Sequence, residues 1–287
     1  MDYGSTLLSC GTASTTGIES FVGGASNGEV GAAAMQYTNP LTRSLSWHKA
    51  WFFLDDDVQV VMVSNITSKT NAPVYSVLDQ KKHNGRVVIN GVPLSIPSSN
   101  ITNARTLWHD NVGYTFDGPN VPTLMVQTGN RTGNWASIGT STQPPSTVDL
   151  FSAAIMHKDL SLPVAYTVYP GMDLAAFNAK RTSTIVRTVR NDAQVSAVWD
   201  EGHQVAMVVF WAASGGSVTF NSTLAGTTSI TSSANSVVIY RAQLQEVTLS
   251  DPSQSHTSIK VSINGKKNTV TLPSGGDAGS SVAWRLA

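Results

Sequence analysis

The fold is decided by three neighbouring segments: FVGGASNGEVGAAAMQY (Phe21–Tyr37), LSWHKAWFFLDDDVQVVMVSNITS (Leu45–Ser68) and VYSVLDQKK (Val74–Lys82). Within the second segment, Ala50–Leu54 and Val58–Val63 are apolar runs of strand length. Asp55-Asp56-Asp57 separates these runs and has the composition of a tight turn. The stretch therefore predicts adjacent antiparallel strands joined by short connections.

The rest of the chain repeats this pattern of strands and turns. Asn90-Gly91 and Asn264-Gly265 lie between extended runs, and both residue types tolerate positive φ, so each pair predicts a hairpin. One short helix is expected over residues 173–180, where Leu174, Ala175 and Phe177 could pack on one face. Further strands are predicted at Leu124–Gln127, Val164–Val168, Thr184–Val189, Val195–Trp199, Val205–Trp211, Ser217–Phe220 and Ser236–Tyr240. We therefore expect an all-β protein built from stacked antiparallel sheets.

Composition narrows the classes of function. The chain has 287 residues, of which 41% are hydrophobic and 13% charged, and its formal net charge is +0. Without a basic surplus, a nucleic-acid partner is not expected. No run reaches the length of a membrane span, so no membrane partner is expected either.

Other sequence features say little about the compartment. Cys10 is the single cysteine and cannot form an internal disulfide. The first residues lack the basic and apolar regions of a secretion signal. Four glycosylation sequons begin at Asn65, Asn100, Asn130 and Asn221, which is the one hint of a glycoprotein.

The composition changes along the chain and predicts three parts. Residues 1–18 are small and polar and are expected to form a linker or frayed terminus. Residues 19–192 contain most of the aromatic residues and the longer strands, which predicts a large β-sandwich. Residues 193–287 become rich in Ser and Thr with shorter strands, which predicts a smaller C-terminal β-sandwich.

Several motifs in order along the chain resemble polysaccharide lyase family 8, the family of hyaluronate, chondroitin AC and xanthan lyases. The opening stretch resembles the start of the central domain of these enzymes. Later matches are LWHDNVGY (107–114), RTGNWASI (131–138), His157 with PVAYTVYPG (163–171), and QLQEVTLSDP (243–252). The resemblance covers roughly residues 19–287 and implies a supersandwich of the galactose-mutarotase type, followed by a smaller C-terminal β-sandwich.

The resemblance also implies a function, and it implies that the domain with the catalytic groups is not included in this sequence. Family members cleave acidic polysaccharides such as hyaluronan, chondroitin or xanthan by β-elimination, without a metal or other cofactor, outside the cell. The base and acid lie in an α/α toroid domain that precedes this region, and none of the toroid's motifs occurs here. We therefore expect little or no lyase activity from this chain alone, with the toroid as a partner in cis or trans. The alternative is a non-catalytic carbohydrate-binding or structural β-sandwich protein.

Asn27 and Glu29 are candidates for a supporting site. In the family, a carboxylate from the central domain supports the catalytic Arg or Tyr across the cleft, and the resemblance assigns Glu29 to this role. Asn27 would be a neighbour that hydrogen-bonds the sugar. The alternative is a solvated hairpin tip, in which Asn-Gly is expected on conformational grounds.

Trp47, Lys49 and Trp51 are candidate substrate-binding residues. On a strand these alternate residues point to the same side. If that side faces the cleft, it offers aromatic and cationic groups to an acidic glycan. The alternative is that Trp51 continues the apolar run after it and packs in the core.

The remaining polar clusters have competing explanations. Residues 80–86 include Lys81, Lys82, His83 and Arg86, which could attract uronate carboxylates or could form a solvated loop. His109 and His157 each lie beside a charged residue and could act as a general base, although lone histidines beside strands are more often structural. The spacing of the six His and of the Asp55-Asp56-Asp57 run does not suit a zinc or calcium site, so no metal is expected.

Overall fold

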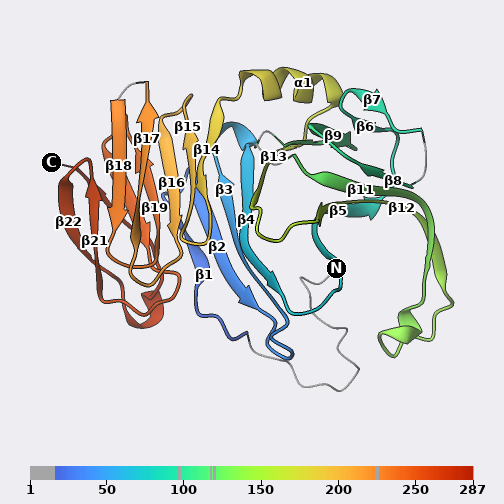
Figure 1. Ribbon diagram of the computed structural model, residues 1–287, viewed down its shortest axis with the longest axis horizontal. Helices are drawn as coiled ribbons and strands as arrows, with labels where there is room; N and C mark the ends of the chain where they lie inside the picture. Colours follow the sequence, from blue (N-terminus) through green and yellow to red (C-terminus); the bar gives the residue numbers. More distant parts are fainter. Residues whose placement is uncertain (1–16, 96–97, 117, 119–120, 224–225, 287) are drawn as a thin grey trace.

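The computed structural model describes residues 17–95, 98–116, 118, 121–223 and 226–286. Their strands form four antiparallel sheets that are stacked in a row across the view of Figure 1. We number them sheets I to IV from the right of Figure 1 to the left. The predicted linker, residues 1–18, lies outside the described residues apart from 17 and 18. The predicted all-β architecture, a large sandwich followed by a smaller one, is confirmed.

Sheets I and II form the large sandwich. Sheet I has the order β5-β12-β11-β8 and sheet II the order β1-β2-β3-β4-β13-β10-β9-β6-β7. The strands of sheet I are β5 (Val74–Lys82), β8 (Ser98–Ile101), β11 (Thr123–Gly133) and β12 (Ser146–His157). Those of sheet II are β1 (Val22–Ser26), β2 (Gly31–Thr38), β3 (Leu45–Phe53), β4 (Gln59–Ser68), β6 (Val87–Ile89), β7 (Val92–Pro93), β9 (Thr106–His109), β10 (Val112–Thr115) and β13 (Val164–Pro170).

Sheets III and IV form the smaller sandwich. Sheet III has the order β14-β15-β16-β19-β20-β23 and sheet IV the order β17-β18-β21-β22. The strands of sheet III are β14 (Val186–Asn191), β15 (Val195–Asp200), β16 (Val205–Phe210), β19 (Ser236–Arg241), β20 (Glu246–Ser250) and β23 (Val282–Arg285). Those of sheet IV are β17 (Gly216–Ser222), β18 (Gly226–Ser232), β21 (Ser258–Ile263) and β22 (Lys266–Thr271).

Short connections and one helix complete the fold. The single α-helix among the described residues is α1 (Leu174–Ser183), and 3₁₀ turns occur at η1 (Asp55–Asp57), η2 (Trp135–Ser137) and η3 (Gly275–Asp277). Within the described part of the chain, no helix combines the length and apolar character needed to cross a membrane.

The predicted hairpin turns are confirmed. Asn90 and Gly91 have φ values of 51° and 79°, and Asn264 and Gly265 have 50° and 85°. Positive φ at both central residues is the geometry that matches the twist of two antiparallel strands. The acidic turn η1 likewise joins β3 to β4, whose ends pair at Phe53 and Gln59.

The predicted helix is present but is longer and packs on a narrower face. Asp173 caps it, since its carboxylate accepts a hydrogen bond from the Ala176 amide at 2.8 Å. Phe177 is buried, whereas Ala175 is exposed, which corrects the expected packing face. A Cβ atom at Gly113 would lie 2.2 Å from the Phe177 ring, so glycine at this position of β10 allows the helix to dock.

Sheet II is apolar on both faces because it packs between sheets I and III. Along β3, Ala50 and Phe52 point towards sheet III and belong to one core with Met207 of β16. Trp51 points the other way and packs against the core between sheets I and II. Successive strand residues face opposite sides, so a run without polar alternation can serve two cores.

Sheet III is also buried on both faces. All six residues of β16, VAMVVF, are buried. Val205, Met207 and Val209 lie in the core shared with sheet II, while Ala206, Val208 and Phe210 lie in the core shared with sheet IV. The core between sheets II and III therefore joins the two sandwiches, in the same way that the other cores join the sheets within each sandwich.

Polar contacts add to the junction between the sandwiches. The side-chain amide of Asn191 donates to the carbonyls of Val63 and Val164 at 3.3 and 3.0 Å. The Ser64 hydroxyl donates to the carbonyl of Asp192 at 2.8 Å. Because β14 pairs with β15 in sheet III, we propose that the boundary between the domains lies between α1 and β14, a few residues before the predicted position at 192.

Candidate functional site

The predicted site residues lie in two separate places on sheet II. The β2–β3 register pairs Gly31 with Phe53 at one end and Tyr37 with Trp47 at the other. These pairs are six residue steps apart along the strands, a distance of roughly 20 Å at about 3.4 Å per residue. Glu29 and Asn27 therefore lie at one end of the hairpin, and Trp47 and Lys49 near the other.

The turn between β1 and β2 is held by Asn27. Its side-chain oxygen accepts hydrogen bonds from the amides of Glu29 and Val30 at 3.1 and 3.0 Å. Gly28, between them, has a φ of 93°. This arrangement is an Asx turn, which fixes the backbone and leaves the Glu29 side chain at the tip.

Glu29 is ion-paired across the two sandwiches. Its carboxylate accepts a hydrogen bond from the guanidinium of Arg241, at the end of β19. The Glu29 side chain is 65% exposed and that of Arg241 18% exposed. Arg241 therefore orients a carboxylate that remains accessible to further partners. No local sequence pattern could have revealed Arg241, because 212 residues separate the pair.

Trp47, Lys49 and Trp51 share one face of β3, as the strand period predicts. That face looks towards sheet I rather than onto an outer surface. Trp47 is 7% exposed and stacks on Tyr37, with ring centroids 5.0 Å apart. Lys49 is 6% exposed, and its Nζ lies 4.9 Å from the centroid of Trp51, which packs against the core between sheets I and II. These side chains therefore do not form an open wall for a polymer.

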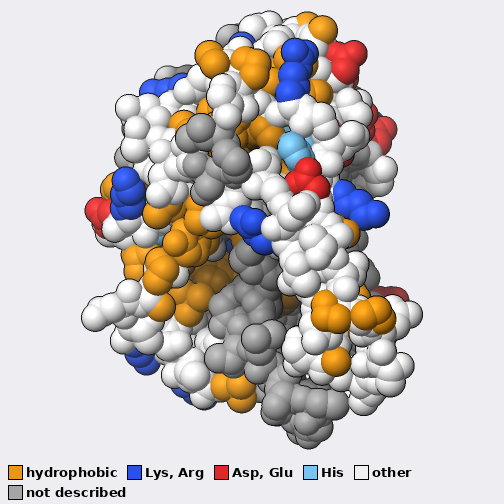
Figure 2. Space-filling view, turned by 90° about the vertical axis from the view of Figure 1, so that its right-hand side faces the viewer, with side chains coloured by type: hydrophobic (Ala, Val, Ile, Leu, Met, Phe, Trp, Pro, Cys, Tyr) orange, Lys and Arg blue, Asp and Glu red, His pale blue; other side chains and the backbone are white. Residues whose placement is uncertain are grey.

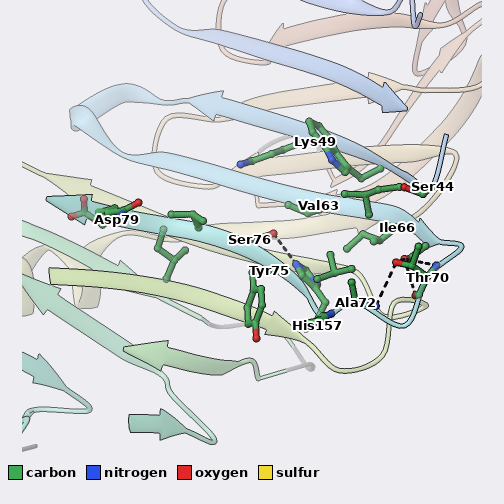
Figure 3. A pocket seen from close by; sticks show the side chains of 18 residues that line it. Ser44, Lys49, Val63, Ile66, Thr70, Ala72, Tyr75, Ser76, Asp79 and His157 are labelled. Carbon is green, nitrogen blue, oxygen red and sulfur yellow. Dashed lines mark hydrogen bonds between the residues drawn. The ribbon is translucent and has the colours of Figure 1, made fainter. Parts of the chain in front are cut away.

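Trp47 and Lys49 instead line a pocket between the two sheets (Figure 3). Its volume is about 620 Å³. Sheet II contributes β3 and β4, and sheet I contributes β5 and the end of β12. The sequence did not predict this pocket, because it requires β5 and β12 to fold over β3. Figure 2 views the molecule from the side of sheet I and shows hydrophobic side chains gathered in a hollow.

Two titratable groups, one buried and one partly buried, face this pocket. Burial lowers the pKa of Lys49 to about 8. Burial, together with the positive charge of Lys49, lowers the pKa of His157 to about 4. His157 Nε2 lies 2.7 Å from the Ser76 hydroxyl, and its Nδ1 is buried without a hydrogen-bond partner among the described residues. At neutral pH the pocket therefore contains an ammonium group beside a neutral imidazole.

His109, the other histidine considered as a base, is enclosed in the core. It is 1% exposed and stacks on Phe151 with ring centroids 4.0 Å apart. Its Nε2 accepts a hydrogen bond from the Asn84 amide at 3.3 Å. Burial, with the charge of Lys81 as the next contribution, lowers its pKa to about 4. These contacts favour the structural explanation for His109.

The basic stretch between residues 80 and 86 is partly neutralised by acidic partners. Lys81 lies 3.3 Å from Asp79 and 3.4 Å from Asp110. His83 lies 3.0 Å from Asp149 of β12. The partners Asp110, in the turn between β9 and β10, and Asp149, in β12, are distant in sequence from this stretch, so the sequence suggested a stronger cationic patch than the structure contains. Among the residues described, no group of three His, Cys, Asp or Glu side chains is placed to hold a metal ion.

Two family models match the chain in order. Residues 1–181 match the model for the super-sandwich domain of polysaccharide lyase family 8, and residues 187–260 match the model for the C-terminal beta-sandwich domain of the same family. Together they confirm the resemblance and the order of the two sandwiches.

Curated relatives and solved structures agree with these matches. The chain is 28% identical to chondroitinase-AC of Pedobacter heparinus over 203 residues, which are 69% of this chain and 28% of that protein. It is 28% identical to xanthan lyase of Bacillus sp. (strain GL1) over 204 residues, which are 64% of this chain and 21% of that protein. The chain thus spans less than a third of the length of these relatives.

Among solved structures, a chondroitinase AC lyase studied with bound oligosaccharides superposes with a TM-score of 0.80 at 26% identity, over 92% of this chain and 40% of that one. A xanthan lyase from Paenibacillus has a TM-score of 0.81 at 20% identity, over 95% of this chain and 29% of that one, and supports the fold alone.

Proposed function

Since the chain belongs to polysaccharide lyase family 8, we propose that it is the β part of an enzyme that cleaves acidic polysaccharides by β-elimination. The observation that carries the proposal is the match of both family models, in order, to residues 1–181 and 187–260. Relatives are named for chondroitin and xanthan, so we propose a uronic-acid polymer of this kind, with hyaluronan as a further candidate. Such polymers lie outside cells, and we therefore propose an extracellular site of action.

We propose that the proton-transfer groups lie outside this chain, in an α/α toroid. β-Elimination requires neutralisation of the uronate carboxylate, a base for the C5 proton and an acid for the leaving oxygen. His109 is 1% exposed, and His48, His109 and His157 each have a buried Nδ1 without a hydrogen-bond partner in the described structure, so we propose none of them as the base. Tyr114 is equally unsuited, because burial raises its pKa and its hydroxyl donates to the Leu78 carbonyl.

We propose that Glu29 is the contribution of this chain to the cleft. A carboxylate has about four acceptor positions, so Glu29 can accept from Arg241 and from an Arg or Tyr of a facing domain. Its 65% exposure leaves room for that second contact. Asn27 uses its oxygen in the turn, so its contact with a sugar would be made through the amide NH₂.

The role of Glu29 can be tested in a chimera. The chain is fused to the preceding part of chondroitinase-AC of Pedobacter heparinus, in place of that enzyme's matching β part. We expect formation of unsaturated uronate from chondroitin, and a decrease in kcat/KM of about 100-fold in Glu29→Gln, because a misplaced partner group costs about this factor. The measurement is ultraviolet absorbance of the unsaturated product.

Asp159→Asn is the matched control, since Asp159 is exposed in the connection between β12 and β13 and is proposed for no role. We expect its activity to equal that of the unchanged chimera. If the chimera is active and its Glu29→Gln variant has the same kcat/KM, the proposed role of Glu29 is excluded.

A further inference from the structure

We propose that the end of the β11–β12 hairpin is a second contact site for an acidic polysaccharide, separate from the cleft to which Glu29 belongs. The inference deepens the proposed function and rests on it for the class of ligand, a chain of sugars that includes uronic acids. It is carried by the exposed Trp135 and Ile138 at the tip of the hairpin and by the positive charge of Arg131.

The outer part of this hairpin, residues 130–149, projects from sheet I as a two-stranded ribbon, and we call it the arm (Figure 1). β8 pairs with β11 over Leu124–Gln127, and β5 pairs with β12 over Leu150–His157, so neither of these neighbouring strands pairs with the arm. The pairing of β11 with β12 continues beyond both, as far as Gly133 and Ser146. A two-stranded ribbon is marginally stable by itself in water, so a contact along the arm would stabilise it.

The turn at the end of the arm holds Trp135 and Ile138 in the solvent. Trp135 begins the 3₁₀ turn η2, and its carbonyl accepts a hydrogen bond from the Ile138 amide at 3.2 Å. Asn134 caps the turn, since its side-chain oxygen accepts from the Ala136 amide at 3.0 Å and its carbonyl from the Ser137 hydroxyl at 2.7 Å. Residues three apart share one side of a 3₁₀ turn. Trp135, 59% exposed, and Ile138, 62% exposed, therefore form an ordered apolar platform that needs little rearrangement to bind.

The surroundings of this platform favour a sugar over an apolar partner. From Gly139 to Thr147 every residue is Gly, Thr, Ser, Gln or Pro, and all except Ser141 are exposed. An indole ring packs on the C–H face of a sugar, while hydroxyl and amide groups beside it hydrogen-bond the sugar hydroxyls. Ser, by contrast, is depleted in the core of protein–protein interfaces. The composition of the arm therefore fits a saccharide better than a second protein.

The charge of the arm selects an acidic ligand. Arg131 is exposed and is the one charged residue between Asn130 and Val148. Its Nη1 donates to the Asn130 carbonyl at 3.1 Å, and a guanidinium has five N–H donors, so donors remain for a carboxylate. Asp149 is in register with Asn130, so it points to the other face of the ribbon from Arg131, where it contacts His83. A uronate can therefore approach Arg131 without meeting a carboxylate on the same face.

The spacing of the two contacts calls for a chain of sugars. The guanidinium of Arg131 lies over the base of the arm, since its Nη1 is 4.0 Å from the place that a Cβ atom at Gly129 would occupy. Gly129 and Gly133 are four residue steps apart, roughly 14 Å at about 3.4 Å per residue, and Trp135 lies beyond Gly133. A Cβ atom at Gly133 would have no neighbour within 4 Å, so space is open between the two contacts. A ligand that reaches both the guanidinium and the indole is therefore an oligosaccharide rather than a single sugar.

The test measures binding to the full chain by isothermal titration calorimetry, with a chondroitin decasaccharide and the neutral maltodecaose as probes. The two probes have the same number of sugar units and differ in charge. We expect the chondroitin probe to bind about tenfold more tightly at about 0.02 M salt, equivalent to about 1.4 kcal/mol. Because Arg131 is exposed, this preference should shrink at about 0.5 M salt, where charges are screened over a few ångströms.

Substitutions in the arm separate stacking from charge. Trp135→Ala is expected to weaken the binding of both probes about tenfold, whereas Trp135→Tyr keeps an aromatic ring at the tip and should retain it. Arg131→Gln should lose the preference for the chondroitin probe and leave the affinity for maltodecaose unchanged. Both positions are exposed, so the urea concentration at half-unfolding should not move in any of these variants.

Lys267→Gln is the matched control for charge. Lys267 is exposed in β22 of sheet IV, in the smaller sandwich, and its replacement removes the same charge as Arg131→Gln. We expect this variant to bind both probes as the original chain does.

The proposal is overturned if neither probe binds, if Trp135→Ala binds both probes as tightly as the original chain, or if Lys267→Gln loses the preference as Arg131→Gln does. It is also overturned if sedimentation shows that the chain without ligand forms dimers that Trp135→Ala abolishes, since the tip would then contact a second copy. None of these outcomes decides the proposed lyase function, which is measured separately as unsaturated product formed by the chimera.

Discussion

Replacing Phe52 with alanine is expected to lower the free energy of unfolding of the entire chain by about 3–5 kcal/mol. Phe52 is 0% exposed and lies in the core that sheet II shares with sheet III. Truncation leaves a cavity whose walls come from both sandwiches, including Met207 of β16. Urea unfolding followed by circular dichroism measures the loss.

Because the two sandwiches share this core, we expect one cooperative unfolding transition both for the original chain and for Phe52→Ala. The whole unfolding curve of the variant should be displaced to lower urea concentrations. Phe53→Ala is the matched control, since Phe53 is the next residue of β3 and is 47% exposed. We expect the control to change the unfolding free energy by less than about 1 kcal/mol. Two separate transitions, of which Phe52→Ala shifts only one, would show that the sandwiches fold independently.

Lowering the pH from 7.5 to 5 is expected to destabilise the chain by several kcal/mol. Burial is the main cause that lowers the pKa of His48, His109 and His157 to about 4, from an unfolded value of 6.5. Between pH 6.5 and 4 the unfolded chain therefore binds more protons than the folded chain, and stability falls as the pH falls. At pH 5 each histidine contributes a loss of about 2 kcal/mol.

His203 opposes this trend. Burial alone would lower its pKa, but the hydrogen bond and charge of Asp200, together with Asp55 and Asp56, raise it above 6.5. Protonation of His203 therefore favours the folded state as the pH falls through that raised pKa, and offsets part of the loss.

The effect of a single partly buried histidine can be isolated at the junction of the sandwiches. His48 packs on Trp211 with ring centroids 4.7 Å apart. His48→Gln removes the titration, so the difference in unfolding free energy between pH 7.5 and pH 5 is expected to shrink by about 2 kcal/mol. Urea unfolding at the two pH values measures this difference. Equal stability of the original chain at both values would contradict the account.

Local patterns predicted the strands and turns well, because hairpins depend on nearby residues. Asn90-Gly91 and Asn264-Gly265 adopt the expected positive φ values. The run from Trp47 to Phe53 lacks polar alternation, a pattern typical of a strand that is covered on both faces, although no such burial was predicted from the sequence. Which sheet covers each face depends on contacts far apart along the chain, and the strand period does not contain that information.

In the candidate site too, local sequence predicted some features, whereas others depend on packing between distant segments. Alternation placed Trp47, Lys49 and Trp51 on one side of β3, but it could not show that sheet I folds over that side. The turn at Asn27 was predictable from its residues, whereas the ion pair between Glu29 and Arg241 depends on how the second sandwich docks. Burial of the histidines likewise follows from packing between sheets.

We propose that this chain forms one wall of a polysaccharide lyase and that the proton-transfer groups belong to another domain. The most direct test is to incubate the purified chain separately with chondroitin, hyaluronan and xanthan and to follow unsaturated uronate by ultraviolet absorbance. Chondroitinase-AC of Pedobacter heparinus, acting on chondroitin, is the positive control. The account predicts no product above background with any of the three polymers. Sustained formation of unsaturated product by this chain alone would contradict it.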